Sequence, residues 1–256
     1  MTVWTTGNAA KLYCLNWIAD YASNHPEPFT ILDLGCGAAT NFVKLLEVYP
    51  QISFVGIEPS ATECERARQN LRHANATIIE GFAYADIKPK LPNSKFEIVV
   101  SFSVFEHVYR RLEYLQFVAD CLTNEGYCLM NYDAGHFHST HWKERFKTLL
   151  APLLARLGDE SRYQAFVREA DFQKWAIQAQ LQIQESKMFN TPLKGIYKAI
   201  PETQREDYMK RWLELEDWLN TIGIEYRDSL SSSWVTRNVI LRKQPHSVSL
   251  STLERD

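Results

Sequence analysis

The sequence predicts an α/β protein, with a mostly parallel sheet of seven strands, helices on both faces of that sheet, and helical cap insertions. Almost unbroken apolar runs alternate with helical patterns through the first 132 residues, which is typical of buried parallel strands joined by helices. Past residue 133, two longer stretches of helical periodicity interrupt this alternation. The closing run, residues 233–241, alternates polar and apolar side chains, and we expect it to take an edge position or to pair antiparallel.

In the first half, apolar runs predict the strands, and helical spacing predicts the segments between them. The first helix is expected over residues 9–23, because its apolar positions recur at helical spacing and stop before two prolines. The expected strands are residues 29–34, 52–57, 76–80, 96–102 and 126–132, and the expected helices between them are residues 41–49, 60–73 and 110–123.

In the second half, the sequence predicts two helical insertions. The first has apolar residues at helical spacing from Trp142 to Leu157 and a further helical stretch over 160–169, and the second has an amphipathic helix between Pro201 and Gly223. Between the insertions we expect a helix over about 171–179 and a strand over 182–189. The whole is predicted to be one domain over residues 1–256, with cap insertions at about 134–170 and 193–224 and a polar tail over 245–256.

Composition favours an ordinary globular domain. The 256 residues are 45% hydrophobic and 23% charged, with a formal net charge of −3. The chain has no long basic run, no signal-peptide pattern, and no apolar segment near the roughly 18–20 residues that cross a bilayer. The five cysteines form no C-x-x-C pair, which is typical of buried thiols in a reducing compartment. We therefore expect a cytoplasmic protein with no nucleic-acid or membrane partner.

Acids and glycines at the ends of the first two predicted strands indicate a nucleoside-binding site. Asp33 precedes Gly35 and Gly37, and Glu58 ends the second strand. Glycines allow a sharp turn and close approach of a ligand to the backbone, and Glu58 is placed to accept hydrogen bonds from both ribose hydroxyls. Thr40 stands where a dinucleotide-binding loop has its third glycine. Asp33 would repel a pyrophosphate, but it suits a cationic tail such as an α-ammonium beside a sulfonium.

With these residues, the chain resembles the class I S-adenosylmethionine-dependent methyltransferases, particularly the small-molecule branch, and the resemblance implies their Rossmann-like sheet. It covers residues 29–132 well. Four segments carry it, namely residues 33–37 (DLGCG), 56–60 (GIEPS), 80–83 (EGFA) and 96–108 (FEIVVSFSVFEHV).

The resemblance implies S-adenosyl-L-methionine as the cofactor. It implies that the glycine loop lines the methionine end, that the acid after the second strand holds the ribose, and that the segment after the third strand contacts adenine. The loop after the fourth strand would flank the methionine and the acceptor. Many relatives carry an aspartate where this chain has Phe82, so adenine recognition is left to backbone groups, to Asp86 or to stacking on Phe82. Tyr13, with Trp17, would close the site from the other side. The expected cofactor-binding residues are Asp33, Gly35, Cys36, Gly37, Glu58, Pro59, Gly81, Phe82, Ala83, Ser101, Phe102, Ser103 and Tyr13.

Histidines are the candidate catalytic residues, because an imidazole can remove a proton near neutral pH. His107 lies after the fourth strand and is interpreted either as a base or acceptor-orienting group, or as a cap of the following helix. His136 and His138 follow the fifth strand and come after Asp133 in the sequence. They allow three interpretations: a base or orienting group, a metal site, or polar residues at a helix entry. The catalytic candidates are His107, His136 and His138, and we expect no metal.

The predicted function is transfer of a methyl group to oxygen or nitrogen of a small or medium organic acceptor, by a monomer or homodimer. The aromatic and apolar insertions would supply a dry pocket over the carboxyl ends of the strands. Alternatives are a peptide or protein acceptor, an NAD(P)-dependent oxidoreductase, and a non-catalytic subunit that binds S-adenosylmethionine.

Overall fold

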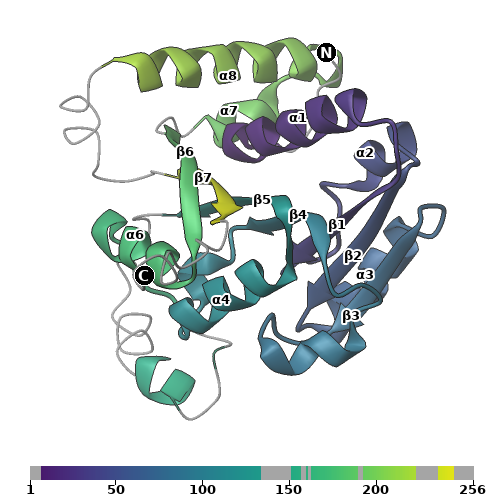
Figure 1. The fold of residues 1–256 in the computed structure, drawn as a ribbon. Coiled ribbons are helices and arrows are strands. Elements are labelled where there is room, and N and C mark those ends of the chain that lie inside the picture. The colour runs from purple at the N-terminus through teal and green to yellow at the C-terminus, as the bar shows by residue number, and fades with distance from the viewer. Residues whose placement is uncertain are drawn as a thin grey trace, which may run out of the picture.

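Seven strands form one sheet, in the order β3-β2-β1-β4-β5-β7-β6, at the centre of Figure 1. Neighbouring strands are parallel except where β7 pairs, because β7 runs antiparallel to both β5 and β6. The computed structural model describes residues 7–133, 151–156, 160, 163–189, 193–222 and 236–244. The strands are β1 (Phe29–Leu34), β2 (Ile52–Glu58), β3 (Ala76–Glu80), β4 (Phe96–Phe102), β5 (Leu122–Asp133), β6 (Leu181–Phe189) and β7 (Thr236–Lys243).

The winding of the sheet reverses between β1 and β4. β1 pairs with β2 on one side and with β4 on the other, so Asp33 lies opposite both Gly56 and Val100. The chain builds outward from β1 to β3 and then returns to the other side of β1 as β4. In open α/β sheets such a reversal leaves a crevice at the carboxyl ends of the strands, and ligands bind there.

Helices cover both faces of the sheet (Figure 1). They are α1 (Ala9–Asn24), α2 (Val43–Val48), α3 (Ala61–Asn70), α4 (Arg111–Cys121), α6 (Glu169–Gln178), α7 (Lys194–Ala199) and α8 (Arg205–Thr221), with 3-10 helices η1 (Ala85–Lys90), η2 (Phe105–His107) and η3 (Glu202–Gln204). Successive strand residues point to opposite faces. Ile31 therefore packs in the core with α1, α2 and α3, whereas Leu32 packs in the core with α4 and α6. α8 contacts α1 and β6, and its Trp212 joins the first of these cores.

The predicted fold class is confirmed, and the first, third and fourth strands begin and end where the sequence predicts. The fifth strand begins earlier than expected, at Leu122, with a register shift opposite Phe96 and Ile98. Antiparallel pairing of the last strand is confirmed, but the edge position is wrong. β7 lies between β5 and β6, because its middle residues are buried, while alternate residues of β6 face solvent.

The helix expected over 160–169 is also wrong within the described residues, because 163–168 are not helical. Their backbone groups bond outside the segment: the guanidinium of Arg111 donates to the carbonyls of Ala165 and Phe166, and Ala165 N donates to the Glu106 carbonyl. Residues 151–156 of the preceding predicted helix are helical. Residues 134–150, Leu157, Gly158, Gly223 and the predicted tail over 245–256 lie outside the described residues.

All five cysteines are free and buried, as expected. In the described part of the chain, the helices are too short or too polar to cross a membrane.

Phe172 of α6 is fully buried, and its ring lies 5.4 Å from Phe105 and 5.1 Å from Tyr132, measured between centroids. We expect Phe172→Ala to lower the free energy of unfolding by about 3–5 kcal/mol, because it leaves a cavity among these rings. Ile177→Ala on the same helix, at a side chain 67% exposed, should change it by well under about 1 kcal/mol. Chemical denaturation measures both, and equal losses would contradict this description of the core.

Candidate active site

A glycine loop leaves β1 and folds back on the end of β2. The N–H groups of Gly35 and Cys36 donate to the Ile57 carbonyl, at 2.8 and 3.0 Å. Gly35 and Gly37 have φ of 77° and 53°, a conformation that glycine adopts without strain. A Cβ on Gly35 would lie 2.5 Å from Val104, whereas one on Gly37 would meet no described atom within 4 Å. The backbone at Gly37 is therefore open to a ligand.

Glu58 ties this loop to the segment after β2. One carboxylate oxygen accepts a hydrogen bond from Gly37 N and the other accepts one from Ser60 N, each at 2.9 Å. The residue is only 9% exposed, so these bonds hold its carboxylate in a fixed position. A carboxylate has about four acceptor positions. With these two donors from the described residues, each oxygen keeps capacity for one more.

A cavity of 180 Å³ lies beside this loop, at the carboxyl ends of β1 to β4. Its walls are mainly apolar, and it is smaller than the roughly 300–1,000 Å³ of sites that enclose a whole ligand of drug size. It therefore suits one flat, apolar-faced part of a larger ligand. The residues that line it are Gly35, Ile57, Pro59, Gly81, Phe82, Ala83, Tyr84, Val104, His107, Val108, Tyr114 and Glu160.

Two acids are buried near the carboxyl ends of the strands, Asp33 in β1 and Glu106 in η2, which follows β4. Oδ1 of Asp33 and Oε2 of Glu106 have no hydrogen-bond partner among the described residues. Burial raises the pKa of Asp33 to about 7, with Lys11 opposing the rise and Glu58 adding to it. Burial likewise raises the pKa of Glu106 to about 7. Such unpartnered acids are the groups that a cationic ligand would satisfy.

The structure brings most of the predicted cofactor-binding residues together. Gly35, Pro59, Gly81, Phe82 and Ala83 line the cavity. The glycine loop adds Cys36 and Gly37, and the ends of β1 and β2 add Asp33 and Glu58.

The side chains after β4 lie differently. Ser101 has no exposed surface, and its hydroxyl pairs with the Tyr114 hydroxyl at 2.8 Å. Phe102 is buried and stacks near Phe42. Ser103 has a positive φ of 57°, and its N–H donates to the carbonyl and side-chain oxygens of Asn131. In this structure the side chains of Ser101 and Phe102 pack inside the protein, so they do not face the cavity.

Tyr13 does not close the cavity, contrary to the sequence-based expectation. Its hydroxyl donates to Glu185 on β6, and its ring contacts the Phe189 ring and the Lys187 ammonium. Trp17 stacks on Tyr21 instead. Helical spacing places these aromatic residues on one face of α1, and that face contacts β5 and β6.

Of the candidate catalytic residues, His107 lines the cavity, and its Nδ1 lies 3.2 Å from the Tyr163 carbonyl. His136 and His138 lie outside the described residues. Asp86 is exposed on η1 and is not part of the described cavity lining.

Sequence reasoning missed Glu160. Its side chain, 9% exposed, accepts hydrogen bonds from the Tyr84 hydroxyl at 2.5 Å, from Tyr109 N at 3.3 Å and from Arg110 Nε at 3.1 Å. The Arg110 guanidinium also lies 3.8 Å from the centre of the Tyr84 ring. Glu160 belongs to no motif, and its partners are 50 to 76 residues away, so no local pattern could have identified it.

Arg111 was missed as well, and it holds the first insertion against the site. Its buried guanidinium donates to the carbonyls of Val108, Ala165 and Phe166, at 3.3, 2.7 and 3.1 Å. The guanidinium also lies 5.3 Å from the centre of the Trp175 ring. A buried cation bonded to three carbonyls fixes the backbone of both segments.

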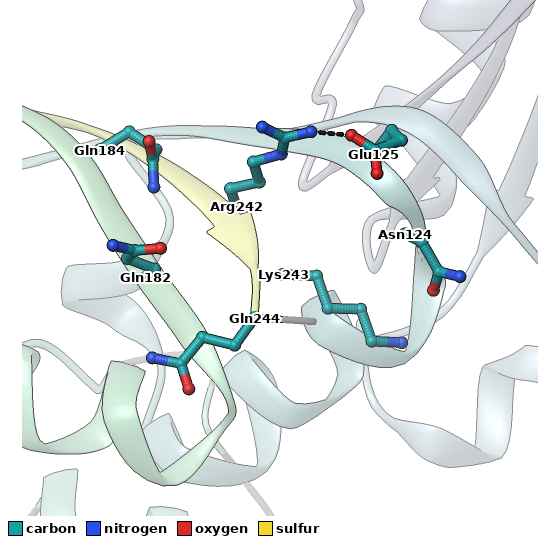
Figure 2. A pocket seen from close by; sticks show the side chains of 7 residues that line it. All are labelled: Asn124, Glu125, Gln182, Gln184, Arg242, Lys243 and Gln244. Atoms are coloured by element: carbon teal, nitrogen blue, oxygen red, sulfur yellow. Dashed lines mark hydrogen bonds and ion pairs between the residues drawn. The ribbon is translucent and has the colours of Figure 1, made fainter. Parts of the chain in front are cut away.

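A larger cleft of 590 Å³ lies at the opposite end of the sheet, where β5 and β6 begin and β7 ends (Figure 2). It is lined by Asn124, Glu125, Gln182, Gln184, Arg242, Lys243 and Gln244, and Arg242 forms an ion pair with Glu125. All of these residues are polar or charged, whereas most ligand sites are lined mainly by hydrophobic and aromatic side chains. The smaller cavity beside the glycine loop is therefore the better candidate.

Residues 32–128 match the family model described as a methyltransferase domain. An uncharacterized protein of Rickettsia prowazekii (strain Madrid E) is 24% identical over 109 residues, which is 42% of this chain and 44% of that protein. The match thus spans less than half the length of that curated relative.

Solved structures of methyltransferases share this fold. A candidate sarcosine dimethylglycine methyltransferase from Galdieria sulphuraria has a TM-score of 0.57 and 15% identity, covering 91% of this chain and 86% of its own. The O-methyltransferase of a Brevibacillus brevis trans-AT PKS multienzyme, in complex with S-adenosyl-L-homocysteine, has a TM-score of 0.56 and 17% identity, covering 91% and 73%. Geranyl diphosphate C-methyltransferase from Streptomyces coelicolor A3(2), in complex with Mg²⁺, geranyl diphosphate and S-adenosyl-L-homocysteine, has a TM-score of 0.56 and 12% identity, covering 89% and 77%. The chain therefore shares its fold with these methyltransferases, and residues 32–128 match a methyltransferase domain.

The raised pKa of Asp33 generates a prediction on stability. In the unfolded chain this carboxyl titrates near about 3.9, whereas burial raises its folded pKa to about 7. Between these values the folded protein keeps a proton that the unfolded chain has lost, so stability falls as pH rises and stays lower above pH 7. We expect Asp33→Asn to raise Tm by roughly 2–4 °C or more at pH 8, with a smaller gain at pH 5.

Thermal unfolding at the two pH values measures this gain. Asp20→Asn, at an exposed aspartate on α1, is the matched control and should show no such dependence. A gain from Asp33→Asn that is equal at both pH values would contradict the raised pKa.

Proposed function

We propose that this chain, an enzyme with a methyltransferase domain in the class I fold, transfers a methyl group from S-adenosylmethionine to oxygen or nitrogen of a small or medium organic acceptor. The observation that carries the proposal is the Glu58 carboxylate. It is held by Gly37 N and Ser60 N at the ends of β1 and β2, within the segment that matches the family model.

The site fits the nucleoside part of this cofactor. Each Glu58 oxygen has capacity for one further donor beyond its bonds to described residues, which suits the two hydroxyls of a ribose. The adjoining cavity has apolar walls, including Ile57, Pro59 and Val104, and such walls suit the faces of a purine ring. The open side of Gly37 lets the ligand pass close to the backbone.

The site also fits a cationic tail. Asp33 and Glu106 each have a buried carboxyl oxygen without a partner among the described residues. A ligand that carries an ammonium and a sulfonium would supply the missing positive charge. A pyrophosphate would instead be repelled by these acids, which supports S-adenosylmethionine over NAD(P).

When bound, the cofactor supplies an electrophilic methyl group, and the chain's own residues supply position and proton handling. Glu58 and the glycine loop would hold the cofactor, and the insertions would exclude water. The Tyr163 carbonyl can only accept a hydrogen bond, so the bond at 3.2 Å puts the ring proton on Nδ1 of His107. His107 would therefore help to hold the bound ligand at the cavity wall. Removal of a proton from the acceptor stays a prediction for the histidine candidates.

Titration calorimetry with S-adenosylhomocysteine tests the cofactor. We expect binding by the wild-type chain and a loss on the order of 100-fold in Glu58→Ala, because two charge-assisted hydrogen bonds to the ribose disappear. Glu65→Ala, at an exposed glutamate on α3, is the control and should bind like the wild type. Absence of wild-type binding would refute the proposal, and binding of NAD(P) instead would favour an oxidoreductase.

A further inference from the structure

We infer that Glu160 selects the base of the cofactor, by accepting a hydrogen bond from the exocyclic amine of adenine. The inference rests on the proposed function, because it assumes that the apolar cavity holds the base. Among the described residues that line the cavity, Glu160 is the only acidic side chain. An ionised carboxylate accepts hydrogen bonds and donates none. It therefore favours a base edge that carries an amine over one that carries a carbonyl oxygen.

Glu160 has room for such a partner. Of the described residues, Tyr84 and Tyr109 donate to Oε2, and Arg110 donates to Oε1. These three bonds use three of about four acceptor positions on a carboxylate. The remaining position is on Oε1, and an amine hydrogen at the cavity would complete it.

The carboxylate is also fixed in place, which discrimination requires. The Tyr84 hydroxyl lies before η1 and the Tyr109 and Arg110 donors lie before α4, so two separate segments hold Glu160. Its side chain is largely removed from water. A buried acceptor that cannot move pays a large penalty when a ligand presents another acceptor to it. Sites built to bond a substrate N–H reject analogues that lack it more strongly than apolar pockets reject a change of size.

Phe82 offers no comparable recognition. It follows Gly81 at the end of β3, but its side chain is 47% exposed and has no group that accepts a conventional hydrogen bond. The first insertion therefore supplies a side-chain acceptor that Phe82 does not.

A purely structural role for Glu160, as a latch between the insertion and Tyr84, makes a different prediction. If Glu160 only holds the insertion in place, its loss weakens the affinity of every ligand of the cavity to a similar degree. If Glu160 hydrogen-bonds to the adenine amine, its loss changes the ratio of the affinities of different ligands. The ratio of two dissociation constants is thus the decisive readout.

The experiment compares S-adenosylhomocysteine with its 6-oxo analogue, S-inosylhomocysteine, by titration calorimetry. We expect the wild-type chain to prefer the adenine ligand by roughly tenfold or more. In Glu160→Gln the preference should fall toward unity, because the amide both accepts and donates. Glu113→Gln is the matched control, since Glu113 also pairs with Arg110, at 3.1 Å, but is exposed. It should keep the wild-type ratio.

The outcomes distinguish failure of the proposed function from failure of the inference about Glu160. If the wild-type chain binds neither ligand, the proposed function fails and this inference fails with it. If it binds both equally, or if Glu160→Gln keeps the wild-type preference, the inference is overturned and the proposed function stands. The ratio of the two dissociation constants can be measured on the wild-type chain alone. The inference can therefore be refuted even if the Glu160→Gln protein does not fold.

Discussion

The hydrogen bonds that Glu58 accepts from two backbone N–H groups set the geometry of the rest of the site. Gly37 and Ser60 follow different strands, so one carboxylate holds the ends of β1 and β2 together. This is possible because the strands pair in parallel register, with Leu34 opposite Ile57, and because the glycine loop takes positive φ. The loop in turn lies against Val104, after β4. Glu58 thus joins two strand ends directly, and the glycine loop that it holds contacts the segment after a third.

That assembly places further acids where burial disfavours charge. Burial raises the pKa of Asp33 and Glu106 to about 7, and each keeps an unpartnered oxygen among the described residues. For stability alone, an apolar side chain of similar volume would serve better at such positions. Ionisable groups kept there at the cost of stability are typical of ligand sites, where the partner arrives with the ligand.

The sequence predicts what is local and misses what depends on distant contacts. The strands of the first half follow from continuous apolar runs, and the glycine loop with its two acids follows from spacing within about twenty residues. Tyr13 was placed wrongly because helical periodicity defines a face of α1 without saying what that face packs against. The edge position of the last strand was wrong because strand order is set by pairing across the whole sheet. Glu160 and Arg111 act through partners 50 or more residues away, where no periodicity or motif can indicate the contact.

These distant contacts couple the cavity to the first insertion. Tyr163 bonds to His107, and Arg111 donates to the carbonyls of Ala165 and Phe166. Glu160, a few residues earlier, bonds to Tyr84 in the cavity wall. These bonds all involve one short stretch of chain. A shift of that stretch would therefore move both Glu160 and the bonding partner of His107. If Glu160 contacts the adenine of the cofactor, an acceptor that shifts this stretch would change cofactor affinity without touching the cofactor. By thermodynamic linkage, the cofactor would then change acceptor affinity by the same factor.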